Sequence, residues 1–376
     1  MDGALAKTLT LILFIVIGVL IRKKFSSREQ VNGIKNMILT IALPATIFVA
    51  LMGVEVKTTM LVYPLAALVF NFMLYFVMPR FLMSFGINPS TKEGRTLRLL
   101  LPSLAPGLSC FPFVIEFLGE SELAIAALAD VGNKVFVLLF LYIVAMNMFL
   151  SQHPASNENG KRKKMKSLII SLVKEPINMV IFVAIGLIMM GVQLTDLPLF
   201  IASAFERMGS MMTPLVLIFI GLAVTVSKNK LVPIFGILLS RSGISLVLVS
   251  LMLWAAGVNQ SSMILLSMAF ALSSCSFWPF AHMASFTQKE DDLGAKNRIF
   301  DLNYGLLVLA ISLPVSTLLI LGVLNSGTFF TNHLSITILG VGLTLLGLIP
   351  RLIERMKRSF RMSTERKMQG SLKPVD

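Results

Sequence analysis

Apolar stretches of about 20 residues recur along the whole chain, and this pattern constrains the fold more than any other feature. Lipid offers no hydrogen-bond partner to a backbone amide, so a segment that crosses a membrane pairs its amides internally, as a helix does. Hydrophobic residues make up 56% of the 376 residues and charged residues only 14%, which is more apolar surface than one water-soluble core absorbs. We therefore expect an all-α integral membrane protein.

Hydropathy and loop signals predict eleven membrane-spanning helices and no folded soluble domain. The predicted spans are residues 4–21, 33–53, 58–77, 97–118, 123–150, 167–192, 199–226, 231–258, 262–286, 299–323 and 334–349. The last of these has the weakest pattern.

Most of the 33 lysines and arginines fall in alternate connectors. The positive-inside rule then places the N-terminus outside and the C-terminus in the cytoplasm of a plasma membrane, the inner membrane in a bacterium. Residues 151–166 form a basic cytoplasmic loop and residues 351–376 a basic cytoplasmic tail, which either contacts anionic lipids or only flanks the last span. Because the cations follow topology, the net charge of +14 does not indicate nucleic-acid binding.

Short sequence matches at nearly constant spacing indicate an internal repeat. Phe14 and Gly18 match Phe182 and Gly186, Pro44 matches Pro214, and Pro112 matches Pro279. These matches predict two inverted five-helix repeats, residues 1–150 and 167–323, followed by an extra transmembrane helix in residues 324–350. Inverted repeats with interrupted helices are typical of secondary transporters.

Prolines in the fourth and ninth predicted spans indicate interrupted helices, because proline lacks an amide donor and clashes with the preceding turn. We expect these two broken helices to cross, although a single proline often marks only a packing kink. Breaks at mid-membrane leave helix N-termini that favour an anion. The substrate-binding residues predicted around the breaks are Ser109, Cys110, Pro112, Ser274, Cys275 and Pro279.

Polar and ionisable residues inside predicted spans are functional candidates by default. Asn133 and Asn303 suit carboxylate recognition or the capping of a broken helix. Arg241 could grip a substrate carboxylate in bidentate fashion; the structural alternative is an ion pair with Asp301 or Glu206. Asp130, Asp301 and Glu116 are the candidates for accepting a coupling proton or ion.

Metal, cofactor and enzyme chemistry have little support in the sequence. The 23 methionines are dispersed, so copper transport is disfavoured, and we expect neither a metal nor a cofactor. Zinc-protease, nucleophile-elbow and phosphate-loop motifs do not occur. We therefore expect a protein that is not an enzyme and that draws its energy from gradients.

Four segments resemble the auxin efflux carrier family of the bile acid/auxin/arsenite-type transporter superfamily: L-P-A-T-I-F around Pro44, F-P-F-V-I-E-F-L-G-E at 111–120, A-A-L-A-D-V-G-N at 126–133 and T-P-L-V-L-I-F-I-G-L at 213–222. The resemblance implies inverted repeats with helices four and nine crossing at Pro112 and Pro279, elevator-like transport of organic anions such as auxin, malate or malonate, and a possible homodimer. The chain departs from the family in having Leu104-Ala105 where a Gly-Asn is frequent, and in its eleventh span.

The leading prediction is a secondary transporter, a permease or efflux carrier, for a small organic anion such as a mono- or dicarboxylate. One alternative is a sodium-coupled organic anion symporter of the bile acid type, with Ser109, Ser274 and Asn133 around the ion. The other is a membrane sensor that binds its ligand without moving it.

Overall fold

The computed structural model describes residues 3–25, 27–53, 60, 62–152, 170, 173–174, 176–223, 231–293 and 297–370. Every regular element within these ranges is helical. The first half contains α1 (Gly3–Ile21), η1 (Arg22–Lys24), α2 (Arg28–Met37), η2 (Ile38–Ala42), α3 (Leu43–Met52), α4 (Val62–Ser84), α5 (Lys92–Leu100), α6 (Pro106–Ser109), α7 (Phe111–Phe117), α8 (Glu120–Val135), η4 (Phe136–Phe140) and α9 (Leu141–Gln152). The rest of the described chain contains α11 (Pro176–Met189), η5 (Leu194–Asp196), α12 (Leu199–Ser210), α13 (Met212–Ala223), α14 (Leu231–Ala255), α15 (Ser261–Ala271), α16 (Phe277–Asp292), α17 (Leu302–Asn325), η6 (Gly327–Phe330) and α18 (His333–Gly370).

Seven helices in the described part are long and apolar enough to cross a membrane. They correspond to the second, third, fifth, seventh, eighth, tenth and eleventh predicted spans. The fourth and ninth predicted spans are divided into shorter helices, and the sixth contains the 14-residue α11. The molecule is thus an all-helical protein with the composition of a multi-pass membrane protein, and the number of eleven crossings stays a prediction.

Pro44 lies inside a continuous helical segment and does not break it. The wide π turn η2 precedes it, and Pro44 occupies one of the first two positions of α3. A π turn relieves the clash that proline makes with the preceding turn. Thr46 then donates to the Ala42 carbonyl at 2.8 Å and to the Gly209 carbonyl of α12 at 3.1 Å.

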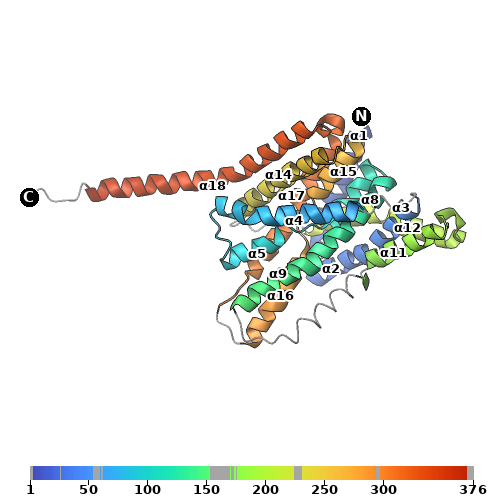
Figure 1. Cartoon of the computed structure of the whole chain (residues 1–376), viewed down its shortest axis with the longest axis horizontal. Helices are drawn as coiled ribbons and strands as arrows, with labels where there is room; N and C mark the ends of the chain where they lie inside the picture. Colours follow the sequence, from blue (N-terminus) through green and yellow to red (C-terminus); the bar gives the residue numbers. More distant parts are fainter. Residues whose placement is uncertain are drawn as a thin grey trace, which may run out of the picture.

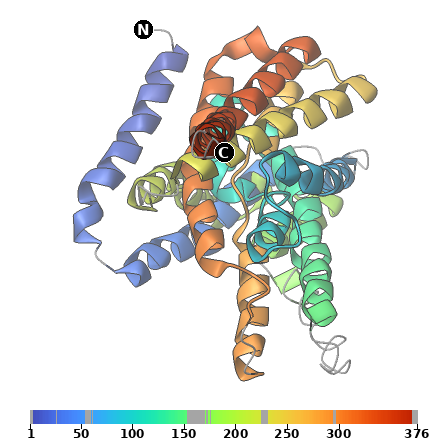
Figure 2. The same ribbon diagram turned by 90° about the vertical axis from the view of Figure 1, so that its left-hand side faces the viewer.

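Glycines bring two helix pairs into backbone contact. A Cβ added at Gly18 of α1 would lie 2.2 Å from the Ile218 carbonyl oxygen of α13, and one added at Gly221 would lie 2.2 Å from the Ile15 carbonyl oxygen. Only glycine permits this approach, which is a common device for packing helices in membranes. Figure 2 shows α1 at one edge of the bundle.

The long helix α18 packs along α14 through a similar contact. Gly236 and Gly243 of α14 face Gly347 and Gly340 of α18, and a Cβ on any of them would lie within 2.7 Å of a neighbouring atom. Ser240 adds a hydrogen bond to the Thr344 carbonyl at 2.9 Å. Figure 1 shows the C-terminal part of α18 extending beyond the other helices.

The predicted basic segments are described only in part. Residues 153–166 of the loop and residues 371–376 of the tail lie outside the described residues. The backbone of residues 351–370 continues α18 as a helix through Pro350, where the sequence had suggested only a tail.

Candidate functional site

Two non-helical breaks interrupt the fourth and ninth predicted spans. Residues 101–105 separate α5 from α6, and residues 272–276 separate α15 from α16. Pro106 and Pro112 lie in the first two positions of α6 and α7, and Pro279 is the third residue of α16. Proline is tolerated in the first helical turn because amides there have no intrahelical partner. Each of these prolines thus lies in the helix that follows a break.

The two breaks are hydrogen-bonded to each other. The Ala105 amide donates to the Ser274 carbonyl at 2.9 Å, the Ser274 amide to Ser109 Oγ at 2.9 Å, and the Ser276 amide to Ser103 Oγ at 3.0 Å. Each break thereby satisfies amides that the other leaves unpaired, which a lipid environment requires. Ser109 and Ser274, two predicted site residues, are brought together here.

Arg241 joins both breaks from the side. It lies in α14 with 1% of its surface exposed. Its guanidinium donates to the carbonyl of Leu101 at 2.8 Å, that of Ser103 at 3.0 Å and that of Ser273 at 2.7 Å. Within the described part of the chain these partners are carbonyls, so the alternative of an ion pair with Asp301 or Glu206 was wrong. A cation thus sits at the junction without a contacting carboxylate among the described residues.

Asn133 links the first break, residues 101–105, to the neighbouring helices by hydrogen bonds. Its Nδ2 donates to the Leu104 carbonyl at 3.0 Å and to Asp130 Oδ1 at 2.8 Å, and its Oδ1 accepts from Asn71 of α4 at 3.0 Å. All of these polar side chains are buried. Asn133 therefore contacts the break, as expected, but its amide is fully engaged by protein groups.

Asp130 forms a buried ion pair. Its Oδ2 lies 3.3 Å from Lys134 Nζ one helical turn away, with side-chain exposures of 4% and 7%. Lys134 also donates to Asn178 of α11 at 3.4 Å. Because a buried charge needs a partner, this pair explains how a carboxylate resides in α8, and it leaves Asp130 poorly placed to meet a substrate directly.

Asp301 and Asn303 are not part of the junction. The helix α17 begins at Leu302, and Asp301 is its N-cap, accepting from the Tyr304 amide at 2.9 Å. Asn303 is exposed in the first turn. The prediction placed Asp301 inside a span because the apolar run begins at Ile299, whereas the helix starts three residues later. Asn303, the second residue of α17, does lie inside a candidate span.

The two cysteines are buried beside the breaks, as the sequence suggested. Cys110 separates α6 from α7, and its carbonyl accepts from the amides of Phe113 and Val114. The Cys275 amide donates to Ser312 Oγ of α17 at 3.3 Å.

Sequence reasoning missed several residues that hold the junction, among them Ser103, Ser312, Asn71 and Asn178. The position of Ser103 between Pro102 and Pro106 was the one available signal.

The first turn of α16 is accessible and carries a nearby cation. Phe277 and Trp278 are 49% and 38% exposed, and Ser276 caps the helix by accepting from the Trp278 amide at 3.3 Å. Lys35 Nζ of α2 lies 4.6 Å from the centroid of the Phe277 ring. A helix N-terminus beside a lysine is an environment that attracts anions.

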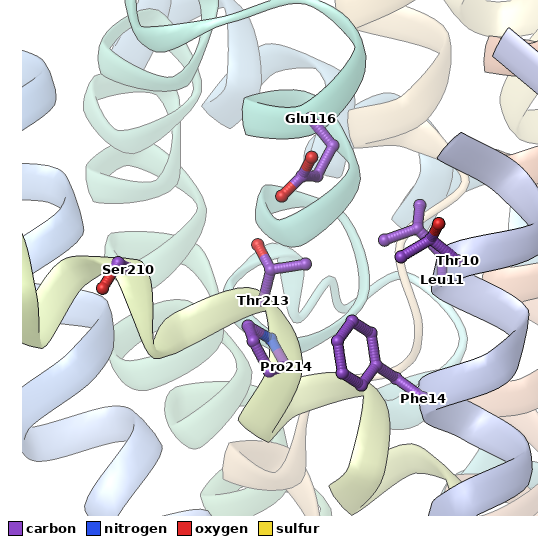
Figure 3. A pocket seen from close by; sticks show the side chains of 7 residues that line it. All are labelled: Thr10, Leu11, Phe14, Glu116, Ser210, Thr213 and Pro214. Carbon is purple, nitrogen blue, oxygen red and sulfur yellow. The ribbon is translucent and has the colours of Figure 1, made fainter. Parts of the chain in front are cut away.

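Glu116 lines a separate cavity of about 350 Å³ between α1, α7 and the α12–α13 segment. Figure 3 shows its carboxyl group pointing toward Thr213, with the Phe14 ring on the α1 side.

No family model matches the chain, and no curated protein matches it either. No group of three or more acidic, histidine or cysteine residues suited to a metal ion occurs among the described residues.

Proposed function

We propose that the protein is a secondary transporter that carries a small organic anion, such as a mono- or dicarboxylate, across a plasma membrane. The observation that supports this most is the buried guanidinium of Arg241 at the junction of two helix breaks. Its charge is shared among carbonyl oxygens and contacts no carboxylate in the described chain, so the junction keeps a positive potential in a low-dielectric region.

The docking place for the anion is the exposed first turn of α16. The helix N-terminus, the Lys35 ammonium 4.6 Å from the Phe277 ring and the nearby Arg241 all favour negative charge. Phe277 and Trp278 add apolar surface for the carbon skeleton of the anion.

The mechanism proposed is elevator-like alternating access between two inverted five-helix repeats with crossed broken helices four and nine. The hydrogen bonds between the two breaks support this arrangement, because they join segments at corresponding places in the two predicted repeats. The resemblance to auxin efflux carriers, and the homodimer it implies, belong to the same proposal.

Sodium coupling at the junction is the less favoured alternative. Ser109 Oγ accepts from the Ser274 amide and donates to the Ala105 carbonyl, the Ser274 carbonyl accepts from Ala105, and Asn133 Oδ1 accepts from Asn71. A sodium site would need these oxygens to coordinate the ion in place of these hydrogen bonds. We therefore expect flux that does not depend on sodium.

The test is counterflow in proteoliposomes that contain a panel of labelled mono- and dicarboxylates, with and without sodium. We expect saturable flux of one anion, unchanged by sodium and reduced about tenfold or more by Lys35→Met, since a charge-assisted contact contributes about 1.5–3 kcal/mol. The matched control is Lys289→Met, because Lys289 lies 5.3 Å from the Phe286 ring but at the other end of α16. Binding without counterflow would favour the sensor alternative.

A further inference from the structure

The C-terminal helix continues well past the part that can cross a membrane. Helix α18 runs from His333 to Gly370, and its apolar span is His333–Arg351. Residues 352–370, here called the α18 extension, lengthen the helix by roughly 28 Å at a rise of 1.5 Å per residue. Figure 1 shows this part of α18 extending beyond the other helices. The distribution of charge predicts that it lies on the cytoplasmic side.

The sequence of the α18 extension is amphipathic at helical spacing. Leu352, Met356 and Phe360 recur at every fourth position, with Ile353 beside them. On a helix these four positions share an arc of about 100°. Most cations of the extension fall outside this apolar arc, and only Lys367 falls within it. The cations outside it are Arg355, Lys357, Arg358, Arg361 and Arg366. A basic amphipathic helix of this kind is typical of segments that lie on a membrane surface or bind an acidic partner.

The start of the α18 extension is fixed beside a second helix of the bundle. A Cβ added at Gly236 of α14 would lie 3.6 Å from Pro350 Cγ, and Ser240 of α14 donates to the Thr344 carbonyl at 2.9 Å. The extension therefore begins where a membrane-crossing helix ends. Covalent attachment at this place gives the lipid surface a high effective concentration, whereas a soluble partner has to be recruited from solution. This difference favours the membrane as the partner.

Pro350 provides a hinge between the span and the α18 extension. In a straight α18, Arg366 lies about 22 Å beyond Arg351 along the helix axis. A charge is attracted to a lipid surface mainly within one Debye length, about 8 Å at physiological ionic strength. Proline has no amide to donate to the Leu346 carbonyl, so bending α18 at Pro350 breaks few hydrogen bonds. Such a bend lays the extension along the surface and brings all of its cations within reach.

From this arrangement we propose that the α18 extension binds the surface of a bilayer that contains anionic phospholipid. The apolar arc enters the boundary between headgroups and acyl chains, and the cations contact the charged headgroups. Neutral lipid supplies only the apolar part of this interaction, so the binding depends on the charge of the lipid and weakens with salt. A soluble acidic protein would meet the same cations without any dependence on lipid composition.

A fluorophore on the full chain in nanodiscs tests the proposal. An environment-sensitive dye is attached at Ser363→Cys, inside the apolar arc, or at Glu365→Cys, outside it. Both native cysteines are buried, so background labelling should be low. When phosphatidylserine is added to phosphatidylcholine, we expect a blue shift of the emission at Ser363→Cys, a much smaller one at Glu365→Cys, and reversal of both by high salt.

Neutralising the cations of the α18 extension should abolish the response. The test variant replaces four residues by glutamine: Arg355, Arg358, Arg361 and Arg366. The matched control removes the same number of cations from the predicted cytoplasmic loop, namely Lys161, Arg162, Lys163 and Lys164, and its blue shift should be unchanged. Thermal unfolding in detergent shows whether each variant keeps its fold.

Four results would overturn the proposal. They are an equal blue shift in pure phosphatidylcholine, an unchanged shift in the arginine variant, loss of the shift in the loop control, or a response to polyglutamate with none to phosphatidylserine. The last result would indicate an acidic protein as the partner. Because the dye reports contact with lipid, the result is independent of whether counterflow of an anion succeeds.

Discussion

Arg241 is the residue on which both helix breaks depend. A guanidinium presents five donors in a fixed fork, and here three separate hydrogen bonds run to carbonyls from two segments far apart in sequence. The ammonium of a lysine is compact and lacks this fork. The side chain therefore sets the relative position of the two breaks, and its effect on a substrate is mainly through the field it creates.

Replacing Arg241 by alanine should destabilise the protein strongly. Each buried carbonyl left without a donor costs about 1–3 kcal/mol, and three are affected. Thermal unfolding in detergent should show a clear fall in midpoint for Arg241→Ala and a similar fall for Arg241→Lys. Arg207→Ala, which removes an exposed arginine of α12, should leave the midpoint unchanged. Equal midpoints for all four proteins would contradict the role assigned to Arg241.

For single residues, the sequence predicted which residues lie near the junction better than it predicted which atoms contact each other. Serines, cysteines and prolines clustered in two spans indicated a junction, and Ser109 and Ser274 do meet there. The partners of Arg241 escaped prediction because backbone carbonyls leave no signature in a sequence. Asp301 was misassigned although an aspartate directly before an apolar run is typical of a helix N-cap.

Helix α18 packs closely against α14, although most of its apolar surface is not covered by the rest of the protein. Only 17% of its predicted span is buried, yet glycines on both helices bring the backbones together. Because α14 carries Arg241, this contact also supports the helix that holds the junction.

A leucine at Gly340 should weaken this pair. Its Cβ would lie 2.7 Å from the Gly243 carbonyl oxygen, and overpacking of this kind costs about 1–3 kcal/mol. Gly342→Leu is the matched control two residues along the same helix, since nothing lies within 4 Å of a Cβ there. Thermal unfolding in detergent should separate the two variants, and equal midpoints would mean that α18 does not stabilise α14.

Most helices could be predicted from hydropathy, whereas the breaks could not be placed. Length and apolar content identify α4, α14 and α17 directly. Proline marks the position of a break only approximately, because it is also favourable in the first turn of the helix that follows the break. Pro106 and Pro279 lie in such first turns. The sequence therefore located each interruption only to within a few residues of a proline.

For the molecule as a whole, cysteine labelling can test the membrane orientation that we infer from the distribution of charge. Both native cysteines are buried, at 0% and 5% exposure, so background labelling should be low. With a membrane-impermeant maleimide on intact cells we expect Lys57→Cys to react, and Ser156→Cys to react only after permeabilisation. The reverse pattern would invert the topology, and labelling of both in intact cells would contradict the predicted number of crossings between them.

The mutual hydrogen bonds of the two breaks have a consequence for biosynthesis. Ala105 emerges from the ribosome long before Ser274, its only partner by a backbone bond across the junction in the described chain. Until the later segment has been made and inserted, the Ala105 amide must stay hydrated or be shielded by the insertion machinery. Maturation of the first half thus waits for the second, and a nascent chain arrested before Leu272 should be held back by quality control instead of being released into the bilayer.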